Sequence, residues 1–396
     1  MLDSRPSSKT SQYFIMTLSA IVLVGIIMVY SSSYMYAKEK FGTSLHYVLR
    51  QLLFLIFSVG ICFVIAKSKF RFWYKYSYYL NMVASGFVAL TFIPGLGPVV
   101  KGANRWIKLG PFSLQPGEFV KYTILLSSLY YFENFSRIDQ KQKIKHGLSL
   151  LIPLALLVLQ PDFGTFSICF GVMAFACFLS SFPRKWFYSL AGAGLVSGGF
   201  ILVSQPYRVR RLLAFLDPWK NAQGSGFQVI QSWIGFANGG FFGKGPGNSI
   251  EKLFYLPEAH NDFIFSVIGE ELGFIGVFLI ICLFLAMIYF GFKMAMEAQS
   301  RISYLIITSL VFAVGLQSLL NMGVVLGLLP TKGLNLPFIS YGGSSLMANF
   351  FAIGLILSST KRVNIDTNQG HEMNKPSSEF RDRMRFQGVR KEVHIN

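Results

Sequence analysis

Apolar stretches of about the length of a bilayer-spanning helix alternate with polar links along this chain. A helix needs about 20 mostly apolar residues to cross the hydrocarbon core of a membrane. Ten segments meet or approach this length, at 13–34, 45–66, 76–95, 117–135, 146–160, 163–181, 186–204, 262–292, 302–329 and 341–359. The pattern therefore predicts an all-α polytopic membrane protein with ten transmembrane helices.

The polar links predict the domain organisation. A short tail at 1–12 precedes a ten-helix membrane domain at 13–359, and the longest link, 205–261, forms a large loop between the seventh and eighth helices. Within that loop, residues 225–238 carry apolar side chains with a helical period, which is typical of a helix lying in the membrane interface. Residues 360–396 mix charges of both signs with few large apolar residues, so we expect a disordered tail.

The distribution of Lys and Arg predicts the orientation of the chain. With the N-terminus in the cytoplasm, the inner links carry 22 of these residues and the outer links carry 13, while Lys121 lies within a segment. Cytoplasmic links of membrane proteins carry such an excess of positive charge. Because the number of segments is even, both termini are expected in the cytoplasm and the loop at 205–261 outside.

The composition excludes a soluble enzyme. Charged residues make up 14% of the chain and hydrophobic residues 53%, whereas soluble domains carry about 25% charged residues. The net charge of +18 suits anionic lipid and an inside-positive topology, and we expect no nucleic acid as partner. The four cysteines lie in apolar runs without the spacing of a metal site.

Ionisable side chains gather near the predicted outer ends of several segments. Such groups are costly at membrane depth and usually mark a pathway or a site. They are Glu118 and Lys121 at the start of the fourth segment, Asp162 in the link QPDFGT, and Glu258, His260, Asp262, Glu270 and Glu271 around the start of the eighth. Asp262 stands where a large polar loop turns into a long apolar helix, which makes it the strongest candidate for chemistry.

Structural roles compete with functional ones for these acids. Glu118 and Lys121 share a helix face and suit an ion pair at a helix start. Asp162, Glu258 and Asp262 suit helix caps, since each stands at or near the start of a predicted helix. The residues alone leave both interpretations open.

The same holds for three other features of the region. His260 could be a plain hydrogen-bonding residue. Glu270 and Glu271 point to different sides of a helix, so at least one of them faces a cavity or a partner, with a helix-packing salt bridge as the alternative. The glycine-rich run 239–248 is interpreted as a flexible turn rather than a phosphate cradle, because no strand precedes it and no helix follows it directly.

Basic residues share the predicted outer side with these acids. They are Arg105, Lys108, Lys121, Arg208, Arg210, Arg211 and Lys332. Such cations suit a phosphate or pyrophosphate, although those at 208–211 equally suit anchoring to lipid headgroups. Acids beside bases at this face favour an anionic, lipid-linked substrate, with one carboxylate taking a proton from a hydroxyl and cations holding a pyrophosphate leaving group.

Four stretches of the sequence resemble the FtsW/RodA/SpoVE proteins, known as the SEDS family. They are GANRWIKLGPFSLQPGEFVKY (102–122), QPDFGT (160–165), LFYLPEAHNDFIFSVIGEELGFIG (253–276) and NMGVVLGLLPTKGLNLPFISYGGSSL (321–346). The resemblance covers about residues 10–362. It implies a ten-helix inner-membrane protein that polymerises lipid II into glycan strands, a peptidoglycan glycosyltransferase.

The resemblance also implies roles for individual residues. Asp262 matches the essential acid of the family. Glu118 and Lys121 match the acid and the lysine of the family's QPxExxK stretch, and Asp162 matches the aspartate of its QPDxGT stretch. Lys332 and Ser344 fall in the last signature.

These assignments lead to a mechanistic hypothesis. Asp262 acts as general base on the sugar 4-hydroxyl of the acceptor, the oxygen attacks the donor's anomeric carbon with inversion, and undecaprenyl pyrophosphate leaves. Arg105, Lys121 and Arg210 are candidates for holding the pyrophosphate, with Lys332 and Ser344 as further substrate contacts. Asp162, Glu258, His260 and Glu271 are expected to support the site. A divalent cation, Mg²⁺ or Mn²⁺, is left open, since the sequence carries no evident ligand cluster.

Other functions remain to be weighed against polymerisation. A ten-helix protein that handles lipid II could flip it across the bilayer, or could only recruit a transpeptidase. The TKG at 331–333 is more similar to division-type FtsW than to elongation-type RodA members. The resemblance implies a class B penicillin-binding protein and other division proteins as partners, at the division septum of the bacterial inner membrane.

Overall fold

Helices make up nearly all the regular structure of the chain. The computed structural model describes residues 8–98, 103–110, 112–203, 215–222, 224, 226–250, 259–331 and 333–361. The helices are α1 (Ser8–Phe41), α2 (His46–Lys67), α3 (Phe70–Lys75), α4 (Ser77–Leu90), α5 (Gly117–Asn134), α6 (Gln140–Leu159), α7 (Phe163–Leu179), α8 (Arg184–Val203), α10 (Phe227–Gly239), α11 (Ile264–Met296), α12 (Arg301–Val325) and α13 (Gly343–Ser359). A 3₁₀ turn, η1 (Pro218–Asn221), and an antiparallel hairpin of β1 (Ile107–Leu109) and β2 (Phe112–Leu114) complete the described elements.

Each of the ten predicted segments coincides with a helix, and the helix expected at 225–238 is α10. Within the described residues, five helices are long and apolar enough to cross a membrane, namely α1, α2, α6, α11 and α12. Two shorter apolar helices, α7 and α13, accompany them. The helix α5 lies in the interior and carries polar residues on its buried sides, such as Glu118, Lys121 and Ser127.

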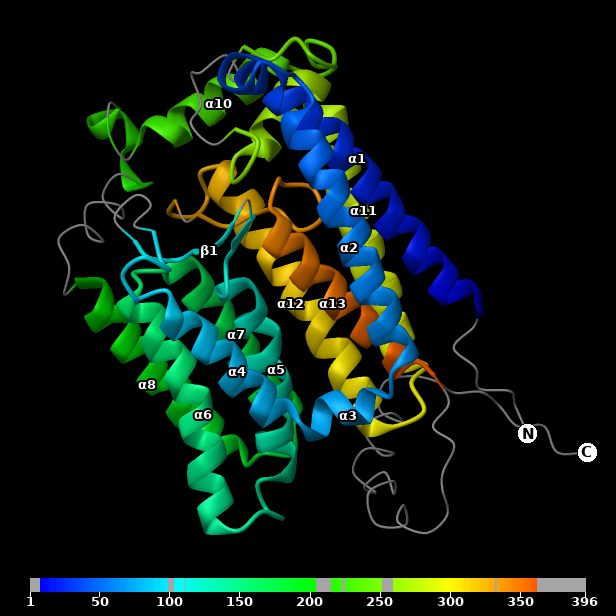
Figure 1. Cartoon of the computed structure of the whole chain (residues 1–396), viewed down its shortest axis with the longest axis vertical. Coiled ribbons are helices and arrows are strands. Elements are labelled where there is room, and N and C mark those ends of the chain that lie inside the picture. Colours follow the sequence, from blue (N-terminus) through cyan, green and yellow to red (C-terminus); the bar gives the residue numbers. More distant parts are fainter. Residues whose placement is uncertain are drawn as a thin grey trace, which may run out of the picture.

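The helices form two groups that meet at α5. One group contains α4, α6, α7 and α8, and the other contains α1, α2, α11, α12 and α13 (Figure 1). In the second group, α13 lies along α2 and α1 lies along α11. Because α5 contacts α4 and α7 as well as α12 and α13, it is buried along most of its length.

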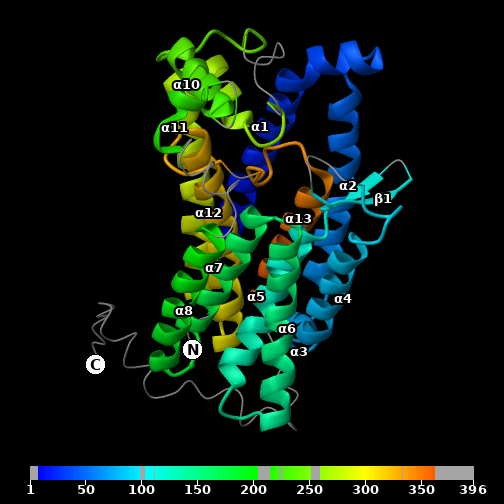
Figure 2. The same ribbon diagram turned by 90° about the vertical axis from the view of Figure 1, so that its left-hand side faces the viewer.

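The two ends of the bundle differ. At one end α10 crosses over the start of α11 (Figures 1 and 2); we call this the α10 end. The β hairpin lies toward the same end on the other side of the bundle, where β2 contacts α13. The opposite end holds the start of α1, the end of α13 and the short helix α3. There Thr10 donates to Glu297 over 3.1 Å and Ser358 donates to the carbonyl of Ser68 over 2.6 Å.

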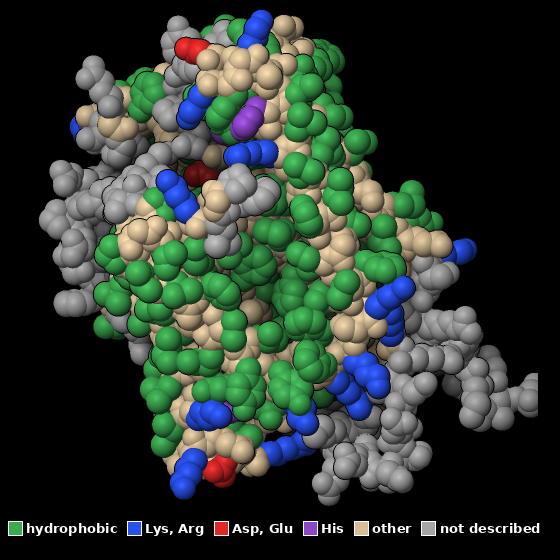
Figure 3. Space-filling view, viewed as in Figure 1, with side chains coloured by type: hydrophobic (Ala, Val, Ile, Leu, Met, Phe, Trp, Pro, Cys, Tyr) green, Lys and Arg blue, Asp and Glu red, His purple; other side chains and the backbone are tan. Residues whose placement is uncertain are grey.

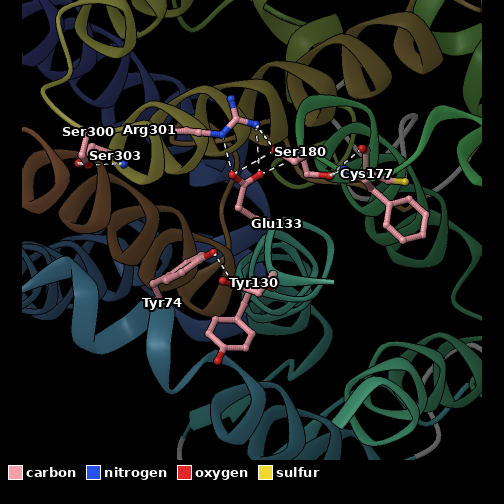
Figure 4. A network of polar contacts seen from close by, with 11 residues as sticks. Tyr74, Tyr130, Glu133, Cys177, Ser180, Ser300, Arg301 and Ser303 are labelled. Carbon is pink, nitrogen blue, oxygen red and sulfur yellow. Dashed lines mark hydrogen bonds and ion pairs between the residues drawn. The ribbon is translucent and has the colours of Figure 1, made fainter. Parts of the chain in front are cut away.

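An ion pair joins the two groups at the opposite end. The guanidinium of Arg301, at the start of α12, donates to both carboxylate oxygens of Glu133 on α5, over 2.6 and 3.2 Å (Figure 4). The same carboxylate accepts from the backbone N–H of Ser181 over 3.0 Å. Nearby, burial raises the pKa of Tyr74 and the Glu133 carboxylate adds to the shift, so this phenol stays neutral and accepts from Asn134 over 3.0 Å.

The surface of the bundle is apolar around its middle. Large hydrophobic side chains such as Ile56, Leu159 and Leu285 are exposed. Hydrophobic side chains cover the centre of the face shown in Figure 3, whereas Lys and Arg gather toward its ends. A surface of this kind is stable in hydrocarbon but not in water. The chain is therefore a multi-pass membrane protein.

Candidate active site

The segment 333–342 runs through the middle of the α10 end and is held by side chains of α12. Asn321 donates from its amide to the carbonyls of Leu334 and Asp262, over 2.5 and 2.8 Å. One turn earlier on α12, the Gln317 amide donates to the carbonyl of Asn335 over 2.9 Å. These two amides replace the backbone pairing that an irregular segment lacks inside a membrane protein.

Asp262 stands at the start of α11, directly against this segment. Its side chain is half-buried, and a Cβ placed on the exposed residue Gly333 would lie 3.2 Å from Asp262 Oδ2. Any side chain at position 333 would therefore crowd the carboxylate. The absence of one leaves this side of the Asp262 carboxylate approachable, which a general base requires.

Glu118 and Lys121 form a buried ion pair on the first turns of α5. Lys121 Nζ lies 2.6 Å from Glu118 Oε2 and 2.5 Å from the Gln317 carbonyl oxygen, and the lysine is only 2% exposed. A lysine enclosed in this way cannot reach a substrate without a rearrangement. The described geometry gives it another task, because it connects α5 through Gln317 to the carbonyl of Asn335.

Asp162 caps α7 and also faces a cation. Its carboxylate accepts from the backbone N–H and the hydroxyl of Thr165, over 3.3 and 2.9 Å, which confirms the capping interpretation. Arg105 Nη1 lies 3.9 Å from Asp162 Oδ1, and the Arg105 side chain is 29% exposed. Arg105 Nη2 donates to the carbonyl of Pro161, and Arg105 Nε is buried without a hydrogen-bond acceptor among the described residues, so an anion can reach this residue only at the exposed part of its side chain.

Ser344 joins the start of α13 to the start of α5. Its hydroxyl accepts from the backbone N–H of Gln115 over 2.9 Å and donates to the carbonyl of Ser113 over 3.4 Å. Gly117, at the start of α5, lies so close to α7 that an added Cβ would come 3.3 Å from the Thr165 methyl group. The starts of α5, α7 and α13 are thus fixed to one another by short contacts.

His260 takes part in a cluster of rings two residues before Asp262. Its imidazole packs against Tyr47 and Tyr341, with ring centroids 4.7 and 5.9 Å apart, and against Tyr36 at 5.8 Å. The His260 carbonyl accepts from the backbone N–H of Tyr341 over 3.0 Å. His260 therefore fixes the approach to α11 on α1, α2 and the 333–342 segment.

Glu270 and Glu271 are both fully buried, and each has partners of its own. Glu271 accepts from the Ser31 hydroxyl of α1, with both carboxylate oxygens 2.6 Å away. Glu270 accepts from Lys244 Nζ over 3.1 Å and from the backbone N–H of Ile250 over 3.0 Å. Glu270 therefore forms a salt bridge, the structural role that the sequence left open as the alternative to a functional one. Its partner lies in the glycine-rich run and not on another helix.

Three predicted site residues, Glu258, Arg210 and Lys332, lie outside the described residues, as do Arg208 and Arg211. Among the described residues, no set of three or more His, Cys, Asp and Glu side chains comes together in a way that could hold a metal ion. Of the described candidate residues, Asp262 lies against Gly333, and Arg105 is a partly exposed cation beside Asp162.

The α10 end also collects the N-termini of several helices. The helices α5, α7, α11 and α13 all begin there (Figures 1 and 2). Helix N-termini carry partial positive charge and unpaired backbone N–H groups, which stabilise nearby anions. The helices α1, α4, α6, α8 and α12 finish at the same end, so the partial charges of helix starts and helix ends are mixed there.

Comparison with known proteins identifies the family. Residues 11–364 match the model of the FtsW/RodA/SpoVE proteins, which is described as "Cell cycle protein". The chain belongs to the FtsW/RodA/SpoVE family. Curated relatives carry the name "Probable peptidoglycan glycosyltransferase FtsW". The relative from Coxiella burnetii is 41% identical and the match covers 87% of this chain and 94% of the relative; the one from Geobacter metallireducens is 38% identical, with 87% and 92% covered.

Solved structures place this FtsW/RodA/SpoVE member in the same fold. One similar chain comes from a structure described as "Structural coordination of polymerization and crosslinking by a peptidoglycan synthase complex". It superposes with a TM-score of 0.70 at 28% identity, and the match covers 88% of this chain and 96% of that chain. The crystal structure of the rod shape-determining protein RodA from Thermus thermophilus gives 0.64 at 24% identity, covering 88% and 95%. The second likeness shows the fold.

Sequence reasoning missed the two amides that hold the site of this family member together. Gln317 and Asn321 stand four residues apart in an apolar segment and so share a helix face. Amide pairs of this spacing are costly in a membrane unless they find partners. Their spacing could therefore have indicated that they have buried partners. Their acceptors could not be predicted, because the carbonyls of Leu334, Asn335 and Asp262 belong to irregular backbone without a sequence pattern.

Proposed function

We propose that the chain is a division-type peptidoglycan glycosyltransferase that polymerises lipid II into β-1,4 glycan strands. The observation that carries the proposal is the half-buried Asp262 carboxylate beside the exposed Gly333. The curated relatives named FtsW support the same activity.

In the proposed reaction, Asp262 accepts the proton of the acceptor's sugar 4-hydroxyl. The electron pair left on the hydroxyl oxygen forms a bond to the anomeric carbon of the donor. The bond from that carbon to the pyrophosphate oxygen breaks at the same time, with inversion of configuration. Undecaprenyl pyrophosphate leaves with the bonding electrons. Negative charge grows on the leaving group, so fixed cations and backbone donors at that place lower the barrier.

Arg105 is the described cation best suited to hold the pyrophosphate, because its side chain is 29% exposed and carries a fixed positive charge. Lys332 and Arg210 stay proposals from the sequence. Lys121, enclosed by Glu118 and Gln317, is better suited to holding the 333–342 segment in place than to contacting the leaving group.

A divalent cation stays a proposal, limited to one that is held jointly by the protein and the phosphates of the substrate. The described residues do not supply the cluster of ligands that a purely protein-held metal needs. Mg²⁺ commonly binds through one or two carboxylates together with substrate phosphates, and Asp262 could provide such a carboxylate. No step of the proposed reaction depends on the metal.

The topology and the setting belong to the same proposal. We propose ten membrane crossings, cytoplasmic termini, tails at 1–12 and 360–396, and the α10 end on the outer side with the loop 205–261. The excess of Lys and Arg in the inner links supports this orientation. A class B penicillin-binding protein is the proposed partner at the septum; the likeness to a chain of a peptidoglycan synthase complex supports a partner of this kind.

A lipid II flippase is the competing function, and an elongation-type polymerase is the alternative within the same reaction. A transporter needs polar groups along a path to both sides of the membrane. Glu118, Lys121, Asp162 and Asp262 all lie toward the α10 end instead, and the Glu133–Arg301 pair closes the opposite end of the interface between the two helix groups. The arrangement favours chemistry at one face.

The test is polymerisation of lipid II by purified protein, with and without a class B penicillin-binding protein. Asp262→Asn keeps the shape of the side chain but removes the base, and we expect a loss of more than about a hundredfold in rate. Asp217→Asn changes an exposed acid of the outer loop and serves as the matched control, with an unchanged rate expected. Equal polymerisation by Asp262→Asn and the wild type would refute the assignment.

A further inference from the structure

The helix α11 is broken close to the site. Gly273 has φ 65° and ψ −163°, a conformation that favours glycine. The break separates an outer piece, 264–272, from the rest of the helix, 274–296. It also interrupts the helical ladder, which leaves N–H groups after the break and carbonyls before it in need of partners.

The glycine-rich run supplies those partners. The carbonyls of Gly240 and Phe241 accept from the N–H groups of Phe274 and Ile275, over 2.9 and 3.3 Å. In the other direction, the N–H groups of Lys244 and Gly245 donate to the carbonyls of Glu270 and Glu271, each over 3.0 Å. The run is therefore neither a flexible turn nor a phosphate cradle. It completes the hydrogen bonding of a broken helix.

The two backbones approach so closely that only glycine fits. A Cβ on Gly243 would lie 2.2 Å from the carbonyl oxygen of Glu271, and a Cβ on Gly273 would lie 2.3 Å from the N atom of Gly243. Gly243 also has a φ of +80°. We call the contact between residues 239–250 and residues 269–275 the clasp.

One ion pair closes the clasp. The Glu270 carboxylate is fully buried and accepts from Lys244 Nζ, the N–H of Ile250 and the hydroxyl of Ser249. The Lys244 side chain is 28% exposed. Without the Lys244 ammonium, this buried carboxylate loses an opposite charge 3.1 Å away, which destabilises the arrangement around it.

The clasp joins the short helical piece that begins two residues after Asp262. Glu270 follows Asp262 by eight residues, about 12 Å along a helix axis. The outer piece is otherwise held at its start, where Asn321 donates to the carbonyl of Asp262 and Ser266 donates to that of Ser232. The break at Gly273 gives this piece a pivot, and the clasp sets its angle.

We propose that Lys244 and Glu270 are a positioning pair for the Asp262 carboxylate. The proposal rests on the glycosyltransferase function proposed above. A base displaced by about 1 Å can lose about a hundredfold in rate, so an error in the angle of the outer piece lowers turnover. Lipid II binding depends on groups elsewhere, including Arg105, and is affected little.

The experiment measures lipid II polymerisation by purified Lys244→Met, Glu270→Gln and Lys244→Arg. We expect kcat to fall about tenfold or more in the first two, with KM within about twofold of the wild type, and Lys244→Arg to recover most of the rate because it keeps the charge. Lys220→Met removes an exposed ion pair with Asp217 in the same outer connection. This matched control should leave kcat and KM unchanged.

A wild-type kcat in folded Lys244→Met or Glu270→Gln overturns the positioning role. So does a rise of KM alone, which would place the pair at the substrate. If Lys244→Met does not fold, Glu270→Gln decides, because its amide oxygen still accepts from Ile250. Failure of the proposed function looks different, since the wild type and Asp262→Asn would then polymerise lipid II equally.

Discussion

The ammonium of Lys121 on α5 lies 2.5 Å from the side-chain carbonyl oxygen of Gln317 on α12. Because the Gln317 amide also donates to the carbonyl of Asn335, a charge buried in one helix group determines where a segment of the other group lies. That segment includes Gly333, the neighbour of Asp262. The ion pair of α5 therefore reaches the proposed base through one amide and a few residues of backbone.

Gln317→Leu removes this connection while keeping an apolar side chain in the helix. We expect polymerisation to fall about tenfold or more, because the 333–342 segment loses the amide that holds the carbonyl of Asn335. Ser318→Ala is the matched control, since the Ser318 hydroxyl bonds only within its own helix, to Val314. A rate assay on both purified variants checks the prediction, and a wild-type rate in Gln317→Leu would contradict it.

Lys121→Met leaves the Glu118 carboxylate buried without its cation. Breaking a buried pair in this way costs about 3–5 kcal/mol, so we expect a clear drop in the melting temperature in detergent. The double variant Lys121→Met/Glu118→Gln removes both charges and should recover much of that stability. A double variant no more stable than the single one would show that charge balance is not what this pair provides.

Asp162→Ala and Asp162→Asn separate the two roles of this side chain. Asparagine still caps a helix, whereas alanine costs about 1 kcal/mol at such a position. We expect Asp162→Asn to keep the stability of the wild type and Asp162→Ala to lose stability. Both lose the charge that faces Arg105, so a common decrease in polymerisation would report on the cation, and unequal decreases would report on the cap.

Arg105→Lys keeps the positive charge but has no equivalent of Nε. Lysine presents a point charge instead of a planar fork of donors, so the variant loses the donor that is buried without an acceptor in the described part of the chain. We expect KM for lipid II to rise several-fold. Lys108→Arg, at an exposed position of the same hairpin, is the control. An unchanged KM in Arg105→Lys would exclude this guanidinium from the substrate.

Arg301→Met opens the ion pair at the end opposite the site. Hydrogen bonds to charged groups contribute about 1.5–3 kcal/mol each, and the partial exposure of both side chains reduces that amount. We therefore expect a modest loss of thermal stability, smaller at high salt. The charge-reversed double variant Arg301→Glu/Glu133→Arg should recover part of it; no recovery would mean that the loss comes from packing.

The helices could be predicted well from the sequence, because a helix in a membrane requires a long apolar stretch that is easily recognised. A span must be apolar over its whole length, so all ten segments appear as helices, although α1 ends seven residues later and α6 begins six residues earlier than predicted. The capping role of Asp162 and the pairing of Glu118 with Lys121 were also readable, since both are local. Their neighbours lie within one helical turn.

Contacts between distant parts of the chain could not be read in this way. Lys244 and Glu270 are 26 residues apart, and no sequence pattern around either residue predicts that they pair. The run at 239–248 was interpreted as a flexible turn because glycine permits one, whereas here glycine permits close contact between two backbones. A glycine-rich composition is compatible with a flexible turn and with close backbone packing. Only the segment that packs against it in the folded structure distinguishes the two.

The helix α12 acts mechanically as a lever arm. It spans 25 residues from Arg301 to Val325, about 37 Å at 1.5 Å per residue. Its lower tip is tied to α5 by Glu133, and its upper part carries the amides of Gln317 and Asn321. A tilt of only about three degrees around that lower tie would move Asn321, which donates to the carbonyl of Asp262, by roughly 1.5 Å. A displacement of that size is enough to misalign a general base.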